Sequence, residues 1–491
     1  MTNPAAALTT VAEIREIDRR AIAALDGDPH TLMVRAAEAA FRRLRARWPE
    51  SRRIVVLCGS GNNGGDGYVL ARLARAAGLE AHVVRATDAE MRTPEARRAR
   101  DDYLAAGGSE QGAGNATLAA DVAVDALLGV GLTRAPEAAY ETLIEAANAA
   151  HAPILALDVP SGLDADTGET PGACIRATAT VAFIAYKRGH ATGRADDVCG
   201  ALALEPLGVD AALIAAVAPA ASRCDRRALA SASTPRARTA HKGDFGHVLV
   251  VGGDHGYGGA ALLASGAAAR AGAGLVSLAT RAEHVAPSLT ARPEVMARAV
   301  ETTHELESMI VRASVVAIGP GLGQLAWGRR LLAAALDSGR ALVLDADALN
   351  LLATAPRQLP PGTIVTPHPG EAARLLGVDT RAIERDRYAA AAALARRFRC
   401  IAVLKGAGTI VSDGERYAVG PPGNPALATG GSGDVLTGVV AALCAQHFEP
   451  FDAARFGVAV HAEAGARVAR HGERGTLASD VVDALVAALA P

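Results

Sequence analysis

The chain has 491 residues, of which 50% are hydrophobic and only 3% aromatic. This length is more than one ordinary hydrophobic core serves, so it predicts two domains. The formal net charge of −2 gives no reason to expect nucleic-acid binding, and no apolar stretch is long enough to span a membrane.

We expect the chain to be a soluble cytoplasmic enzyme. Its six cysteines are scattered and include no Cys-x-x-Cys pair, which is typical of small core residues in a reducing compartment. The first ten residues lack the basic segment and following apolar run of a secretory signal peptide.

A glycine-rich segment follows the first strongly predicted strand. Residues 53–58 form an apolar run typical of a buried parallel strand, residues 59–67 follow it, and we expect a helix to open at Tyr68. The segment has the Gly-x-Gly-x-x-Gly spacing of a dinucleotide-binding turn. The next strand, residues 80–86, lacks the acidic residue that this fingerprint places at its end, so the match is incomplete.

Three polar side chains in this segment, Asn62, Asn63 and Asp66, have two interpretations. They can be formers of a turn that binds nothing. They can also be ligands of a phosphate and a cation, and their place at the end of a parallel strand favours this second interpretation.

Two further predicted strands end in oxygen-bearing side chains. Asp125 precedes a glycine turn after one strand, and Asp158 and Ser161 follow the next. A lone aspartate there is usually a turn former or a helix cap. Carboxylate, amide and hydroxyl oxygens together are hard ligands, so with Asn63 this set indicates a hard cation rather than zinc.

Residues 218–240 are rich in Pro, Ser, Arg and Ala and show no clear periodicity. We expect them to be a linker between a first domain at residues 1–217 and a second at residues 241–491.

In the second half, one apolar strand after another is followed by glycine or polar residues. In open α/β sheets ligands bind at the carboxyl ends of strands, so these segments predict one binding site. They are Gly319–Gly323, Asp345–Asn350, Thr366–Glu371, which displays His368, and Lys405–Thr409.

The segment Ala428–Asp434 is a glycine-rich loop ahead of an apolar run. Such a loop at a helix start offers free N–H groups to a phosphate. A carboxylate beside a phosphate is repelled, so Asp434 has two interpretations that this loop alone leaves open. It is either a base that deprotonates a hydroxyl attacking phosphorus or a helix N-cap.

These motifs of the second half, together with His241–His247 and Gly272–Val276, resemble the ribokinase-like superfamily and, more narrowly, the ADP-dependent NAD(P)H-hydrate dehydratases. The first-half segments at Asn62, Asp125 and Asp158 resemble the NAD(P)H-hydrate epimerase domain. The resemblance implies an α/β fold with an N-terminal Rossmann-like α/β/α sandwich and a C-terminal ribokinase-like α/β domain.

The resemblance also implies an activity: epimerisation of the R and S forms of NADHX and NADPHX, and dehydration of the S form at the expense of ADP. Asp158 and Asp434 would be catalytic. K+ would bind Asn63, Asp125 and Ser161, and Mg2+ would accompany ADP. We also expect a homo-oligomer.

The remaining site residues follow from the same match. The epimerase substrate would contact Asn62, Asn63, Gly64, Gly65, Asp66, Gly129, Val130, Gly131, Leu132, Thr133, Arg134, Ala135 and Asp158. The dehydratase substrate would contact Ala260, Gly323, His368 and Asp434, and the nucleotide Lys405, Gly406, Ala407, Gly408, Thr409 and Gly433.

Two alternatives stay open: a ribokinase-like small-molecule kinase fused to a dinucleotide-binding domain, and a nucleotide sensor without catalysis. The motifs at residues 241–247 and 366–371 argue against the kinase. The presence of both Asp158 and Asp434 argues against the sensor.

Overall fold

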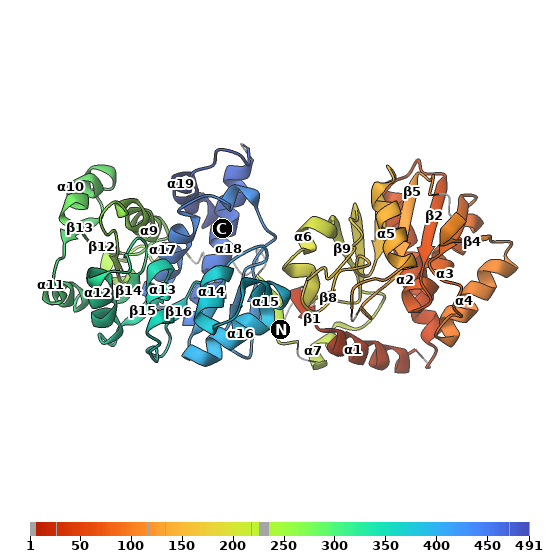
Figure 1. Ribbon diagram of the computed structural model, residues 1–491, viewed down its shortest axis with the longest axis horizontal. Helices are drawn as coiled ribbons and strands as arrows, with labels where there is room; N and C mark the ends of the chain where they lie inside the picture. The colour runs from red at the N-terminus through yellow and green to blue at the C-terminus, as the bar shows by residue number, and fades with distance from the viewer. Residues whose placement is uncertain are drawn as a thin grey trace. The chain divides into compact units, whose positions relative to one another are not determined.

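The computed structural model describes residues 6–25, 27–115, 118–132, 134–217, 219–224, 235–470 and 472–490. The chain divides into two compact units, Met1–Ser222 and Arg223–Pro491. Both are α/β, as predicted (Figure 1). The predicted linker at residues 218–240 includes one short strand, β10 (Ala221–Arg223), which pairs antiparallel with β1 (Ala7–Thr9). Thr133 lies outside the described residues.

The first unit contains a parallel sheet with the strand order β4-β3-β2-β5-β6-β7-β9. Successive side chains of one strand serve different cores: Ile54 and Val56 pack in one cluster with α2, α3 and α4, whereas Val55 and Leu57 pack in another with α5. Helices therefore cover both faces, which explains why the central strands are continuous apolar runs. The bounds are β2 (Arg53–Cys58), β3 (Glu80–Arg85), β4 (Glu110–Gly112), β5 (Val122–Ala126), β6 (Ile154–Leu157), β7 (Ala179–Phe183), β8 (Tyr186–Lys187), β9 (Ala201–Glu205), α1 (Val11–Ala23), α2 (Pro29–Arg47), α3 (Asn62–Ala76), α4 (Pro94–Ala105), α5 (Ala139–Ala149), α6 (Ala195–Val198) and α7 (Ala211–Val217).

The expected start of the helix after β2 is wrong by six residues, because α3 begins at Asn62 and not at Tyr68. Glycine makes the early start possible. A Cβ on Gly64 would lie 2.0 Å from the carbonyl oxygen of Gly59, and one on Gly67 would lie 2.6 Å from the side chain of Ala126. The segment is therefore a tightly packed first helical turn rather than an open loop.

The second unit is built on strands in the order β13-β12-β11-β14-β15-β16-β17-β18-β19. Strands β13 to β17 are parallel, and β18 and β19 continue the sheet antiparallel. The strand bounds are β11 (His247–Val251), β12 (Leu275–Thr280), β13 (Met296–Ala299), β14 (Val315–Ile318), β15 (Ala341–Leu344), β16 (Ile364–Val365), β17 (Ile401–Leu404), β18 (Ile410–Ser412) and β19 (Tyr417–Val419). The helix bounds are α9 (Gly258–Arg270), α10 (Ala282–Ala291), α11 (Thr303–Ile310), α12 (Ala326–Leu336), α13 (Ala346–Thr354), α14 (Pro369–Leu376), α15 (Thr380–Arg385), α16 (Arg387–Phe398), α17 (Ser432–Ala445), α18 (Pro450–Ala469) and α19 (Ala478–Ala488).

Strands β11, β14, β15, β16 and β17 are consecutive neighbours, so the polar segments that follow them meet at one edge of the sheet. Over this sheet α17 packs against α9, with α18 and α19 completing the same core (Figure 1). Almost every residue of α17 after its first turn is buried. This packing holds the start of α17 at the edge of the sheet where the polar segments meet.

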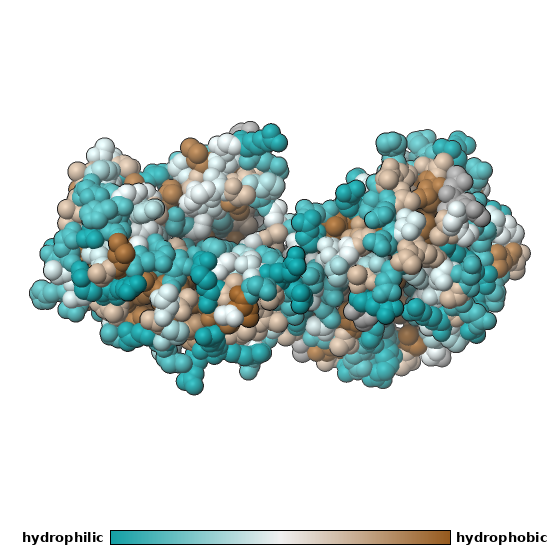
Figure 2. Space-filling model, in the orientation of Figure 1, coloured by the Kyte–Doolittle hydropathy of each residue, from teal (hydrophilic) through white to brown (hydrophobic). Residues whose placement is uncertain are grey.

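Hydrophilic residues cover most of the face in view of Figure 2, and apolar side chains are scattered over it. Within the described part of the chain, no helix has the length and apolar character needed to cross a membrane.

The contact between α17 and α9 gives a stability prediction. A Cβ on Gly438 would lie 2.1 Å from the carbonyl oxygen of Ala264, so Gly438→Ala should destabilise the second unit by about 1–3 kcal/mol. The control is Gly259→Ala in α9, which meets no atom within 4 Å and should change stability by less than about 1 kcal/mol. Chemical denaturation measures both, and equal effects would contradict the close helix contact.

Candidate active sites

A cavity of about 420 Å³ opens in the first unit at the carboxyl ends of β2, β5 and β6. It includes seven of the residues predicted to bind substrate: Asn62, Asn63, Asp66, Gly129, Val130, Gly131 and Asp158. Gly64 and Gly65 instead pack against Gly59 and Met33, and Leu132, Arg134 and Ala135 are not in the cavity lining. Roles in binding stay predictions for these five residues and for the seven that line the cavity.

Asp158 is held in an unusual backbone conformation. Its φ of 63° lies in the left-handed region, and its N–H donates to the carbonyl oxygen of Val181 at 2.8 Å. Its Oδ1 accepts from the N–H of Phe183 at 3.0 Å and forms an ion pair with Lys187, whose side chain is only 1% exposed. Lys187 also donates to the carbonyl oxygen of Phe183 at 3.0 Å. Both side chains line the cavity, so the carboxylate of Asp158 and the ammonium group of Lys187 would both face a ligand bound there.

The predicted cation ligands meet beside this cavity. Ser161 Oγ lies 2.5 Å from Asp125 Oδ1, and the N–H of Ser161 donates to Asp125 Oδ2 at 2.8 Å. Asn63 donates through Nδ2 to the carbonyl oxygen of Leu128 at 3.0 Å, and the carbonyl of Leu128 also lies 3.1 Å from Ser161 Oγ. The Oδ1 atom of Asn63 is buried and has no hydrogen-bond partner. An orphaned buried oxygen beside a carboxylate, a hydroxyl and a carbonyl fits a hard cation.

Burial raises the pKa of Asp125 to about 6, although hydrogen bonds from Ser161 and Leu127 lower it. A bound cation would stabilise the ionised form of this fully buried carboxyl.

In the second unit Asp345 is the centre of the site. It is 1% exposed, it accepts from Lys405 Nζ at 2.6 Å through Oδ1, and it accepts from Thr437 Oγ1 at 2.7 Å through Oδ2. Lys405 Nζ also lies 3.9 Å from Oε2 of the buried Glu371. Burial alone would lower the pKa of Lys405, but the two carboxylates outweigh it and leave that pKa raised. Asp345 thus ties together β15, β17 and α17.

Asp434 lies in the first turn of α17, where the N-cap residue is Gly431 with a φ of 91°. The N-cap interpretation of Asp434 is therefore wrong. Burial raises its pKa to about 7, with a further increase from the charge of Asp345 and a decrease from Lys405. A carboxyl with this pKa is half ionised near neutral pH, which suits a general base.

The segment Lys405–Thr409 forms a turn between β17 and β18. Thr409 closes it, since its Oγ1 donates to the carbonyl oxygen of Gly406 at 2.9 Å. The buried Arg387 stabilises the turn, because its Nη2 donates to the carbonyl oxygen of Lys405 at 3.2 Å. Gly406 has a φ of 140°, and a Cβ there would lie 2.8 Å from Arg387. Gly433 also lies close to the ammonium group, because a Cβ on it would lie 3.2 Å from Lys405 Nζ. The turn and the start of α17 thus present bare backbone beside one ammonium group.

His368 caps the neighbouring helix α14. Its Nδ1 accepts from the N–H of Gly370 at 3.0 Å, and its own N–H donates to Glu371 Oε2 at 2.8 Å. Burial and then the charge of Lys405 lower the pKa of His368. The half-exposed ring is therefore neutral at pH 7 and can meet a ligand without adding charge.

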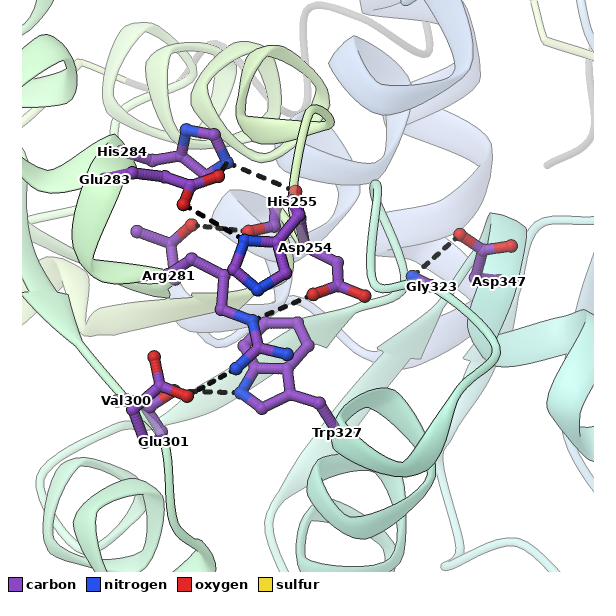
Figure 3. Close-up of polar contacts among 12 residues, drawn as sticks. Asp254, His255, Arg281, Glu283, His284, Val300, Glu301, Gly323, Trp327 and Asp347 are labelled. Carbon is purple, nitrogen blue, oxygen red and sulfur yellow. Dashed lines mark hydrogen bonds and ion pairs between the residues drawn. The ribbon is translucent and has the colours of Figure 1, made fainter.

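The predicted hydrate contacts Gly323 and Ala260 are positioned by the loop after β11. A Cβ on Gly323 would lie 2.5 Å from Asp254 Oδ2, and its N–H donates to Asp347 Oδ2 at 3.0 Å. Arg281 donates to Asp254 at 2.8 Å, pairs with Glu301 and stacks over Trp327 (Figure 3). Ala260 lies beside the same turn, 3.4 Å from a Cβ placed on Gly321.

Several charged or polar residues in these sites had no role in the sequence interpretation. Asp345, Asp347 and Glu371 stand inside motifs that the sequence singles out, so their position at strand ends was the signal for them. No local pattern marks the others, because tertiary contacts alone bring them to the sites: Asp18, Lys187, Arg387 and Thr437.

The two sites define a two-domain α/β nucleotide-handling enzyme, and comparison with known proteins gives its family. Residues 29–189 match the family model described as YjeF-related protein N-terminus, and residues 248–486 match that described as NAD(P)H-hydrate dehydratase. The chain is 46% identical to the bifunctional NAD(P)H-hydrate repair enzyme of Escherichia coli, over 96% of this chain and 92% of that one. It is 45% identical to that of Coxiella burnetii, over 96% of each chain. The chain belongs to the bifunctional NAD(P)H-hydrate repair enzyme family.

Solved structures agree for the second unit. A ribokinase-like superfamily protein from Enterococcus faecalis is 28% identical and matches with a TM-score of 0.52, over 55% of this chain and 95% of that one. The predicted ribokinase-like fold is thereby confirmed.

The ion pair of the buried Asp345 with the partly buried Lys405 gives a second stability prediction. Lys405→Met leaves the Asp345 carboxylate buried without its ammonium partner, so it should destabilise the second unit by roughly 3–5 kcal/mol. Adding Asp345→Asn removes the unpaired charge and should recover part of that loss. A double-mutant cycle by urea denaturation measures the coupling. Strictly additive effects would show that the pair does not hold the site together.

Proposed function

We propose that the chain repairs hydrated nicotinamide dinucleotides: the first unit interconverts the R and S forms of NADHX and NADPHX, and the second dehydrates the S form. The observation that carries the proposal is the partly buried Asp434 beside Lys405 at the start of α17. A base next to an ammonium group and exposed backbone N–H groups suits phosphoryl transfer to a hydroxyl.

For dehydration, Asp434 removes the proton from the hydroxyl on the ring carbon next to nitrogen. The hydroxyl oxygen attacks the β-phosphorus of ADP, and AMP leaves. The ring nitrogen then pushes its electron pair toward that carbon as the carbon–oxygen bond breaks and phosphate departs. Loss of a proton from the adjacent ring carbon restores NADH or NADPH. Products are therefore AMP, phosphate and the reduced dinucleotide.

The nucleotide is assigned to the turn Lys405–Thr409 and Gly433, because bare backbone and one cation converge there. Mg2+ is expected to accompany the diphosphate of ADP, and we assign it no ligand from the chain. Ala260, Gly323 and His368 are assigned to the hydrate.

In the first unit Asp158 is the proposed acid and base of epimerisation. On the ring face that it reaches, it protonates a departing hydroxyl or takes a proton from water that adds there, with a ring iminium in between. Lys187 holds the carboxylate in place. Asn63, Asp125 and Ser161 would hold K+, whose charge would offset the buried carboxylates and the dinucleotide phosphates. A homo-oligomer and a cytoplasmic location remain part of the proposal, and light scattering tests the oligomer.

The first test of this function concerns Asp434. Asp434→Asn should keep ADP binding and lower the rate of dehydration about 10²–10⁴-fold, since the general base is gone. Because only the ionised carboxyl accepts a proton, kcat/KM of the unmodified chain should fall as the pH drops below about 7.

Asp345→Asn serves as the matched variant for this pH profile. It removes the negative charge that raises the pKa of Asp434, so the acidic limb should move to lower pH. Absorbance of the reduced ring follows both reactions. Near-normal turnover by Asp434→Asn, or an acidic limb that stays in place in Asp345→Asn, would remove Asp434 from the mechanism.

A further prediction separates the two activities. Asp158→Ala should leave dehydration of the S form intact, so a mixture of epimers should be consumed in a fast phase followed by slow spontaneous epimerisation. The unmodified chain should consume both epimers without a break. A single fast phase from Asp158→Ala would show that Asp158 is not the epimerisation acid and base.

A further inference from the structure

The charged groups of the first-unit cavity outnumber those that the proposed epimerisation uses. Four carboxyl groups, Asp18, Asp66, Glu95 and Asp158, share the cavity with the ammonium group of Lys187. Asp158 already forms an ion pair with Lys187 and accepts a hydrogen bond from the N–H of Phe183. Among the described residues, nothing donates a hydrogen bond to the carboxyl of Asp18, although it faces the same cavity.

Asp18 has a fixed position relative to the Asp158–Lys187 pair. It lies in α1, directly after the buried Ile17, and α1 follows β1. Strand β1 pairs in parallel with β8, which places Thr9 opposite Lys187, and Thr9 Oγ1 donates to the carbonyl oxygen of Tyr186 at 3.1 Å. The N-terminus of α1 is anchored as well, because the N–H of Val11 donates to Asp166 Oδ1 at 2.7 Å. Helix α1, which carries Asp18, therefore directly follows the strand that pairs with the strand of Lys187.

The chemistry needs a second group that carries a proton. Inversion at a ring carbon requires that the hydroxyl leaves from one face as water and that another water adds to the other face. Each face needs an acid for departure and a base for return, and one carboxyl reaches one face of a planar iminium.

We propose that Asp18 is the second acid and base of the epimerisation site, acting on the ring face that Asp158 does not serve. The inference rests on the proposed epimerase activity. In one direction Asp158 protonates the leaving hydroxyl, water departs, and Asp18 takes a proton from the water that adds to the opposite face. The roles reverse in the other direction, and after a turnover in one direction proton exchange with water returns both carboxyls to their starting state.

The surroundings of Asp18 support this role. Burial, more than the charge of Asp158, raises the pKa of Asp18 to about 6 despite the opposing charge of Lys187. Helix α7, which packs against α1, has no charged residue. The other charged groups that line the cavity are Arg15, Asp66, Arg92 and Glu95.

Oxygen exchange tests the inference in the full-length chain. Each epimer carries an ¹⁸O-labelled hydroxyl and is incubated without ADP, and both inversion and loss of ¹⁸O to water are followed. Asp18→Asn should slow inversion about 10²–10⁴-fold. It should still exchange the label of the epimer whose hydroxyl faces Asp158, because departure and return on that face need only Asp158. Asp158→Asn should exchange only the other epimer.

The control is Glu16→Gln on the same helix, whose carboxylate pairs with Arg19 and Arg20 away from the cavity and which should behave as the unmodified chain. Inversion at the normal rate by Asp18→Asn, or equal loss of inversion and of exchange in both epimers, would overturn the inference. If the unmodified chain does not invert the hydrate at all, the proposed epimerase function fails instead.

Discussion

The second unit depends on a single buried carboxylate. Asp345 follows β15, and its two oxygens bind Lys405 from the strand end of β17 and Thr437 from α17. An unpaired charge in this position would be strongly destabilising, so the three elements must meet in one register. That register brings Gly433 against Lys405 and places Asp434 in the field of both charges. One ion pair thus organises the proposed phosphate site, and its two charges act on the pKa of Asp434.

In the first unit, a strained backbone conformation positions the aspartate. Asp158 has a left-handed φ of 63°, which its hydrogen bonds to Val181 and Phe183 and its ion pair with Lys187 maintain. The orphaned oxygen of Asn63 lies beside the same cavity. Each unit therefore holds the aspartate proposed as catalytic next to a lysine, which is buried in the first unit and partly buried in the second, although the two folds reach that arrangement through different strands.

The strand-end rule made much of this predictable. Apolar runs ending in glycine or polar residues located Asp125, Asp158 and Lys405, because parallel strands bring their carboxyl ends together, and a glycine-rich loop ahead of an apolar run located Asp434. The rule failed on helix starts. At Asn62 and at Ser432 glycines extend the helix into the predicted loop, and only the packing distances around them reveal it. It also missed Lys187 and Asp18, since β1, β8 and α1 meet through tertiary pairing that leaves no local pattern.

The most direct test follows the hydroxyl oxygen during dehydration. If Asp434 deprotonates the hydroxyl of the hydrate so that it attacks ADP, that oxygen must leave bound to phosphorus. The S hydrate carrying ¹⁸O in its hydroxyl is incubated with ADP and a chain carrying both Asp18→Asn and Asp158→Ala, which lacks both groups proposed to exchange the label. Mass spectrometry of the phosphate should find one ¹⁸O per reduced dinucleotide formed. Unlabelled phosphate would show that water attacks ADP instead and would contradict the account.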